Sequence, residues 1–167
     1  MIRFKKWHFK SIIKEIFIAL LLLFVLSNVI SYLRKPTLPS SALPNIEAKL
    51  IDGSLFHIER GKPLLIHFWA TWCPSCKLEA SNIETVSQHY NVLTIAVNSG
   101  STSELRQYMQ DHDLHFKVIN DTHGIWAKQF KVQAFPTSFI YDAKGKLGFT
   151  EVGYTSTLGL IARLEAL

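Results

Sequence analysis

The sequence contains few cysteines, two among 167 residues, so no second disulfide can compete for this pair. A closed zinc site needs two further Cys or His ligands at matched spacing, and the seven histidines form no paired motif of the His-x3-His kind. After an N-terminal region the chain also lacks repeats and low-complexity tracts. With 48% hydrophobic residues and scattered glycine and proline, it is predicted to bury one good-sized core.

Most of the chain has no net positive charge. The formal net charge is +5, but residues 1–35 hold seven basic residues and a single acid, Glu15. Residues 36–167 carry 11 basic and 12 acidic residues, a net charge of −1. The basic character therefore belongs to the N-terminus, and the composition gives no indication of nucleic-acid binding.

Residues 16–33, IFIALLLLFVLSNVISYL, contain no charge and are long enough for a short membrane-spanning helix. Basic residues are more frequent before this stretch (Arg3, Lys5, Lys6, Lys10, Lys14) than after it (Arg34, Lys35). The positive-inside rule then predicts a basic cytoplasmic segment at 1–15, with the rest of the chain outside. A cleaved signal peptide is the alternative, with small residues at 40–42 that lie far beyond the apolar stretch. A buried core helix is disfavoured because the stretch is apolar on every face.

The next residues predict a tether and then one domain. Residues 36–44, PTLPSSALP, contain three prolines and three Ser or Thr residues, a composition that resists helix and stays extended. We therefore predict a Pro/Ser-rich tether at 34–44 and a folded domain at 45–167.

Within the domain, short apolar segments alternate with helical ones, which predicts an α/β fold with a mixed sheet. Residues 46–51 and 55–58, around the turn Asp52-Gly53, are predicted to form an antiparallel hairpin. The nearly continuous apolar run LLIHFWA at 64–70 is typical of a central strand covered on both faces. Further strands are predicted at 92–97, 116–119, 137–141 and 147–153, and helices at 74–90, 102–113, 123–130 and 155–167, the last capped by Thr155 or Ser156.

Both cysteines lie in the segment FWATWCPSCKLE, at Cys73 and Cys76. As a structural staple they would close only a two-residue loop and restrict the unfolded chain little. As metal ligands they suit transient copper(I) binding better than a zinc site. The redox interpretation is favoured by the predicted elements. A strand ending near Thr71 and a helix starting near Pro74 place Cys73 at a helix N-terminus. There the helix dipole and the free N–H groups lower the pKa of a thiol. Cys73 is therefore predicted to be the attacking sulfur and Cys76, one turn inside the helix, the resolving sulfur.

The segment FWATWCPSC resembles the active-site segment of thioredoxin-fold oxidoreductases. The string Cys73-x-x-Cys76-Lys77-x-Glu79 is similar to the membrane-tethered TlpA/ResA/CcmG (DsbE) branch, and most similar to its suppressor-of-copper-sensitivity protein D group. The resemblance covers about residues 43–167 and includes the turn at 52–53, Phe135-Pro136-Thr137 before an apolar strand, and Asp142-x-x-Gly145. It implies a thioredoxin fold, with a central mixed sheet flanked by helices and an N-terminal β-hairpin extension, behind one transmembrane helix.

The same resemblance implies a protein-disulfide oxidoreductase held in the bacterial inner membrane with its catalytic domain in the periplasm. It implies protein thiol and disulfide substrates, no metal, and no cofactor beyond the redox-active Cys73–Cys76 disulfide. The implied direction is reductive, with the pair recharged by a membrane thiol electron donor of the DsbD/ScsB type. A disulfide-forming oxidant, a copper-binding module using the two thiols and a redox-inert interaction domain are the alternatives.

The resemblance further implies a cis bond between Phe135 and Pro136, which sets the backbone of residue 135 beside Cys73 to pair with an extended substrate strand. A trans proline in ordinary core packing is the alternative. Trp72 is predicted to be exposed beside Cys73 as a docking surface, whereas Trp69 is predicted to belong to the core. The predicted substrate-binding residues are Trp72, Pro74, Ser75 and Phe135.

Two residues are candidates for moving the proton of the resolving cysteine. Thioredoxin has a buried acid where this chain has His67, which is either a catalytic base or a neutral, hydrogen-bonded core histidine. Glu79 matches an acid beside the active site of the tethered branch, and its alternative is an exposed helix acid paired with Lys77 or solvent. Lys77 is predicted to be a solvated helix residue whose charge also favours a thiolate. The predicted catalytic residues are thus Cys73, Cys76, Glu79 and Pro136.

Overall fold

The computed structural model describes residues 7–36, 38, 40–59 and 61–167. Residues 1–6 of the predicted basic segment and residues 37 and 39 of the predicted tether lie outside the described residues. The chain divides into two compact units, Met1–Arg34 and Lys35–Leu167, and each is described by itself.

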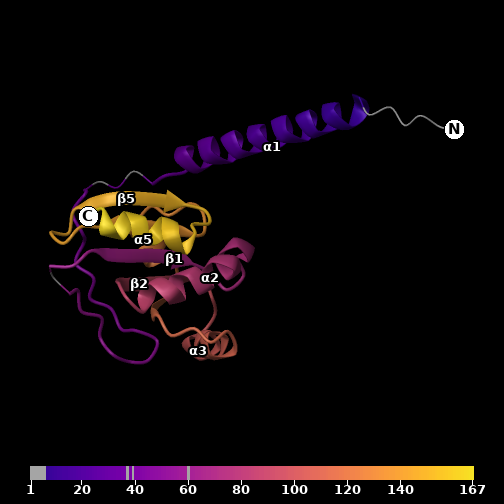
Figure 1. Cartoon of the computed structure of the whole chain (residues 1–167). Coiled ribbons are helices and arrows are strands. Elements are labelled where there is room, and N and C mark those ends of the chain that lie inside the picture. The colour runs from indigo at the N-terminus through magenta and orange to yellow at the C-terminus, as the bar shows by residue number, and fades with distance from the viewer. Residues whose placement is uncertain (1–6, 37, 39, 60) are drawn as a thin grey trace. The chain divides into compact units, whose positions relative to one another are not determined.

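The first unit contains the helix α1 (Trp7–Leu33; Figure 1). It begins before the predicted span of 16–33, and the side chains of residues 11–26 are all exposed. These include a run of large apolar side chains from Ile16 to Leu26. Within the described part of the chain, we find no helix whose length and apolar character would let it cross a membrane.

The second unit is built on a five-stranded mixed sheet with the strand order β3-β2-β1-β4-β5. The strands are β1 (Leu64–Trp69), β2 (Asn91–Val97), β3 (Lys117–Asp121), β4 (Thr137–Tyr141) and β5 (Leu147–Val152). The central strand β1 is parallel to β2 and antiparallel to β4, and β2 is parallel to β3. Every residue of β1 is buried, as the apolar run at 64–70 predicted for a strand covered on both faces.

Four helices complete the second unit: α2 (Pro74–Ser87), α3 (Thr102–Asp111), α4 (Ile125–Gln129) and α5 (Thr157–Glu165). Leu65 and Trp69 of β1 belong to a core shared with α2, α3 and α5, and Figure 1 shows α2 and α5 next to each other in front of the strands. The alternate residues Leu64, Ile66 and Phe68 pack with α4 and the segment 46–56 on the other side. The predicted mixed sheet flanked by helices is therefore confirmed.

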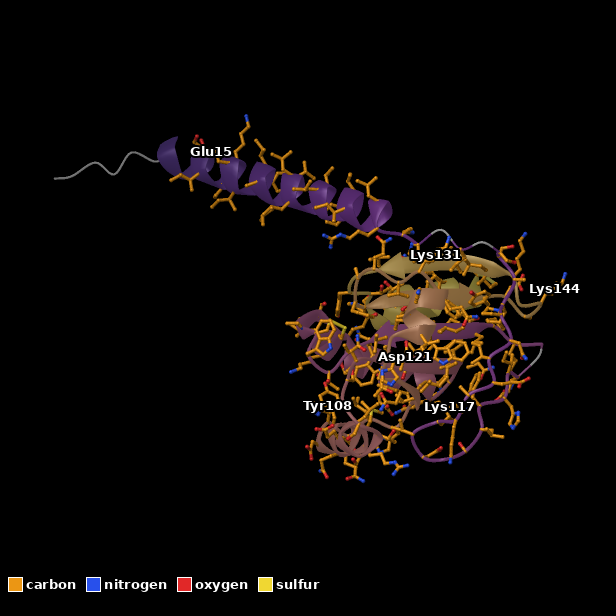
Figure 2. All side chains as sticks on the ribbon, turned by 180° about the vertical axis from the view of Figure 1, so that it is seen from behind. Glu15, Tyr108, Lys117, Asp121, Lys131 and Lys144 are labelled. Carbon is orange, nitrogen blue, oxygen red and sulfur yellow. A yellow bond between two sulfur atoms is a disulfide. The ribbon has the colours of Figure 1, made fainter. Side chains whose placement is uncertain are left out.

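Local hydrogen bonds explain where the helices begin. The Ser156 side chain accepts a hydrogen bond from the Gly159 N–H, so Ser156 rather than Thr155 caps α5. Asp121, at the end of β3, accepts from the N–H groups of Ile125 (2.7 Å) and Ala127 (2.9 Å) and thereby begins α4. Figure 2 shows Asp121 within the domain and Lys144 pointing outward from the turn between β4 and β5.

The predicted hairpin at 46–58 is correct in its turn and wrong in its strands. The Gly53 N–H donates to the Leu50 carbonyl at the expected turn, but the two arms pair only next to it, through the single bridge of Lys49 with Leu55 and the hydrogen bonds from the Leu50 N–H to Ser54 and from the Phe56 N–H to Ala48. Ile46, Leu50 and Phe56 instead bury their side chains in the core on the α4 side of the sheet. Packing against the sheet has therefore replaced continuous pairing between the two arms.

The segment before this turn lies against the domain. Residue 42 forms a bridge with residue 146, the Leu147 N–H donates to the Ser41 carbonyl, and the Leu43 N–H donates to the Gly145 carbonyl. Leu38 and Leu43 are partly buried against the same core as Phe56. The described part of the predicted tether thus includes residues that are attached to the start of β5.

Candidate redox-active site

Cys73 and Cys76 form a disulfide at the N-terminus of α2, with their Cα atoms 5.3 Å apart. Cys73 is the N-cap of the helix: its backbone is extended and its Sγ accepts a hydrogen bond from the Cys76 N–H at 3.2 Å. Pro74 occupies the first helical position, where a missing N–H costs nothing. The predicted strand, turn and helix around the cysteines are therefore all present.

Both cysteines are largely covered in this disulfide form. Cys73 exposes 4% of its surface and Cys76 exposes 2%, less than expected for an exposed attacking sulfur. Both residues belong to the core that includes Trp69 and Ala70, which accounts for the covering. A partner must therefore approach Cys73 over the side chains that surround it.

Trp72 forms part of this surrounding surface. Its side chain is 57% exposed, as predicted, and its indole N–H donates to the Asn98 carbonyl at 3.1 Å. The ring meets Phe135 edge to face, with 5.6 Å between the centroids. Trp72 is thus an exposed aromatic side chain held in one orientation by a polar and an apolar contact.

The Phe135–Pro136 bond is cis, as the resemblance implied. Ser75 joins this segment to the cysteines, because its Oγ lies 3.4 Å from Cys73 Sγ and donates to the Phe135 carbonyl at 3.4 Å. Pro136 is buried, and its carbonyl accepts from the Gly153 N–H at 2.8 Å. Residues 73, 75 and 135, which are far apart in the sequence, thus meet at one place.

Glu79 is fully buried on α2, one turn beyond Cys76 on the same side of the helix. Neither carboxylate oxygen has a hydrogen-bond partner of ordinary geometry among the described residues. Burial raises the pKa of the Glu79 carboxyl to about 8, and the Thr155 backbone N–H opposes this shift only in part. The alternative of an exposed helix acid is therefore wrong, because the side chain is buried.

His67 is a buried side chain of β1, and its Nδ1 lies 2.9 Å from Ser138 Oγ on the neighbouring strand β4. Burial lowers the pKa of His67 to about 3, so the imidazole is neutral at physiological pH. This geometry supports the interpretation as a neutral, hydrogen-bonded core histidine. It disfavours a base that takes up a proton during turnover.

Lys77 is exposed on α2, as expected of a solvated helix residue. In the part of the chain that the structure describes, no group of three or more His, Cys, Asp or Glu side chains could hold a metal ion.

Sequence reasoning missed the residues that hold the loop between β1 and α2. The Thr71 N–H donates to Ser99 Oγ at 3.1 Å, and the neighbouring Asn98 carbonyl holds Trp72. A signal was available, since Asn98-Ser99-Gly100 follows the predicted strand at 92–97, and the structure shows that strand, β2, parallel to β1. The carboxyl ends of parallel strands share one edge of the sheet, where sites of α/β proteins form.

The raised pKa of Glu79 predicts a pH-dependent effect of the substitution Glu79→Gln. Between the ordinary value of 4.5 and about 8, the carboxyl ionises in the unfolded chain but keeps its proton in the folded one, so wild-type stability falls as pH rises through this window. The variant has no such group. Its stability relative to wild type should therefore grow across the window by on the order of a few kcal/mol and then level off.

Denaturant unfolding of both proteins over this pH range measures the difference. The exposed residue Glu47 supplies the matched control Glu47→Gln, whose difference from wild type should not show this rise. A Glu79→Gln difference that stays constant with pH would contradict a carboxyl kept protonated by burial.

Comparison with known proteins agrees with this geometry. The model of the AhpC/TSA family matches residues 37–150. A thioredoxin-like protein of Haemophilus influenzae is 29% identical over 159 residues, covering 93% of this chain and 94% of that protein. The thiol-disulfide oxidoreductase ResA of Bacillus thuringiensis is 30% identical over 113 residues, covering 65% of this chain and 64% of that protein.

Among solved structures, the exposed lipoprotein thioredoxin of Streptococcus pneumoniae superposes with a TM-score of 0.67 at 23% identity, covering 74% of this chain and all of that one. This likeness shows the thioredoxin fold. Since the family model covers more than half of the chain, the protein belongs to the AhpC/TSA family, in which it is a thioredoxin-like protein-disulfide oxidoreductase.

Proposed function

We propose that this chain reduces disulfides in protein substrates outside the bacterial inner membrane, as a member of the suppressor-of-copper-sensitivity protein D group. The observation that carries the proposal is the Cys73–Cys76 disulfide at the start of α2, with the Phe135 backbone connected to it through Ser75. This arrangement combines a redox-active pair with a backbone segment that an extended substrate can join.

The reaction begins with the reduced pair. The Cys73 thiolate attacks one sulfur of a substrate disulfide; that S–S bond breaks, a Cys73–substrate disulfide forms, and the second substrate sulfur leaves as a thiolate. Cys76 then loses its proton and attacks Cys73 Sγ, which forms the Cys73–Cys76 disulfide and releases the first substrate sulfur. Two electrons have passed to the substrate, and the pair must be reduced again by a donor.

The helix N-terminus explains why Cys73 is the attacking residue. Its Sγ already accepts the Cys76 N–H at 3.2 Å and lies at the positive end of the α2 dipole. Both features stabilise negative charge on this sulfur. Cys76 lies inside the helix and is positioned to reach Cys73 within one turn.

In this mechanism the Cys76 proton passes to the ionised form of Glu79, which is the minor form of this carboxyl at neutral pH. Its pKa of about 8 is close to the ordinary thiol value of about 8.5, so a proton passes between the two groups at little free-energy cost. Its burial on the Cys76 side of α2 keeps solvent from competing for the proton. His67, whose pKa is about 3, is too weak a base for this role.

The reductive direction and the membrane location rest on the sequence. The Cys73-x-x-Cys76-Lys77-x-Glu79 string resembles a branch whose members are recharged by a thiol donor of the DsbD/ScsB type. Residues 16–33 are uncharged and follow a basic segment, which is the pattern of an anchor with a cytoplasmic N-terminus. We therefore assign residues 16–33 to the inner membrane and residues 45–167 to the periplasm.

The substitution Cys76→Ala tests the exchange mechanism. Without its resolving sulfur, the enzyme should accumulate mixed disulfides between Cys73 and substrate proteins, visible as adducts on non-reducing gels that dithiothreitol removes. Cys73→Ala is the matched control and should trap nothing. A copper-binding module would instead lose copper in either variant and form no adducts, and that outcome would overturn the exchange mechanism.

The reduction potential of the Cys73–Cys76 pair tests the direction. Equilibration of the full chain with glutathione and dithiothreitol buffers, followed by alkylation of free thiols, measures this potential. A reductant should give a value near that of thioredoxin, about −270 mV. A reduction potential of about −120 mV would instead identify a disulfide-forming oxidant.

The proposed location is tested with the reduced chain in intact spheroplasts. A membrane-impermeant maleimide should alkylate Cys73, because the proposal places this residue on the outer face. The variant Cys73→Ala in a Cys76→Ala background provides the unlabelled control. Protection of Cys73 until the membrane is lysed would contradict the placement.

A further inference from the structure

The Ser75 hydroxyl lies between two groups that have different parts in disulfide exchange. Its Oγ is 3.4 Å from Cys73 Sγ, the attacking sulfur, and 3.4 Å from the carbonyl oxygen of Phe135. Ser75 is half-buried in the first turn of α2. Since a serine hydroxyl has one proton to donate, it can serve only one of the two acceptors at a time.

In the disulfide form the carbonyl is the better acceptor. Cys73 Sγ is bonded to Cys76 and carries no charge, and neutral sulfur is a weak acceptor. The hydroxyl accordingly donates to the Phe135 carbonyl. Among the described residues this is the one hydrogen bond of the Phe135 backbone, and no partner is present for its N–H.

This contact bears on substrate binding because an extended strand pairs through both groups of a residue. Two residues opposite each other in an antiparallel pair exchange an N–H donor and a carbonyl acceptor. In the disulfide form the Phe135 N–H is available, whereas its carbonyl is occupied by Ser75. A substrate strand must displace the hydroxyl to form the second bond.

Reduction reverses the preference of the hydroxyl. A dithiol reductant supplies two electrons and two protons to the Cys73–Cys76 bond, and Cys73 then releases its proton to solvent and becomes a thiolate. Hydrogen bonds to a charged acceptor are roughly twice as strong as those between neutral groups. Because Oγ is already equally distant from both acceptors, rotation of the O–H bond is sufficient for it to donate to the sulfur.

We propose that Ser75 couples the redox state of Cys73 to the affinity of the Phe135 backbone for extended protein segments. This inference rests on the proposed function and deepens it. In the reduced enzyme Ser75 donates to the thiolate, and the Phe135 carbonyl is free to pair with an incoming substrate. In the oxidised enzyme Ser75 donates to that carbonyl and assists release of the reduced product.

The test measures binding of insulin B chain with both cysteines replaced by serine, a probe that can pair as a strand but cannot exchange disulfides. Fluorescence anisotropy of the labelled probe gives its affinity for the oxidised and the dithiothreitol-reduced full chain. One net hydrogen bond corresponds to about a fivefold difference in affinity, so the reduced wild type should bind about fivefold more tightly. Ser75→Ala should bind equally in both states, at the level of the reduced wild type.

Two variants control for effects on the helix. Ser75→Thr keeps the hydroxyl and should keep the preference for the reduced state. Ser81→Ala makes the same chemical change at an exposed site of α2 and should behave as wild type. A second readout is the thiolate absorbance of Cys73 against pH, where loss of the hydroxyl should raise the measured pKa in Ser75→Ala alone.

The outcomes separate this inference from the proposed function. Equal binding by the two states of the wild type, including no binding in either, would overturn the coupling, as would a preference that survives in Ser75→Ala. Reduction of intact insulin by the wild type tests the proposed function independently. If the wild type does not reduce insulin but still binds the probe more tightly in the reduced state, the proposed function is wrong and the coupling stands. If it reduces insulin but binds the probe equally in both states, only the coupling is wrong.

Discussion

The attachment of the α2 N-terminus to the end of β1 is the constraint on which the site depends. Cys73 caps the N-terminus of α2 with its own sulfur, which accepts a hydrogen bond from the Cys76 N–H. The sulfur atom that reacts is therefore also the atom that caps the start of the helix. Replacing the usual capping oxygen by sulfur leaves the N–H groups of the first turn directed at a group that becomes negative on reduction. The same contact therefore orders the loop, positions Cys76 and stabilises the thiolate.

Burial acts in opposite directions on the two ionisable groups near this helix. The Glu79 carboxyl lacks hydrogen-bond partners of ordinary geometry among the described residues and keeps its proton up to about pH 8, whereas His67 keeps its ring neutral down to about pH 3. In both cases the low-dielectric core disfavours the charged form. Both groups are thus neutral at pH 7, and of the two only the carboxyl ionises at a pH close to that at which a thiol does.

The elements around the cysteines were accessible from the sequence because their signals are local. An apolar run with a continuous pattern predicts a buried strand, and Pro74 after a cysteine predicts a helix start. The hairpin at 46–58 was overestimated for the opposite reason. Its alternating pattern is compatible with strand pairing, but the arms pair only next to the turn, and Ile46, Leu50 and Phe56 bury their side chains in the core on the α4 side of the sheet.

The sequence by itself determined the mixed α/β pattern, the identity of the redox pair and the exposure of Trp72 beside it, since each depends on residues close together in the chain. Only the tertiary structure decided that Glu79 is buried without an ordinary hydrogen-bond partner among the described residues, that His67 is bonded to Ser138, and that Ser75 reaches the Phe135 carbonyl. His67 and Ser138 are 71 positions apart, and Ser75 and Phe135 are 60 apart. Contacts at such separations arise when β4 packs beside β1, and no local pattern of residue types encodes the distances that result.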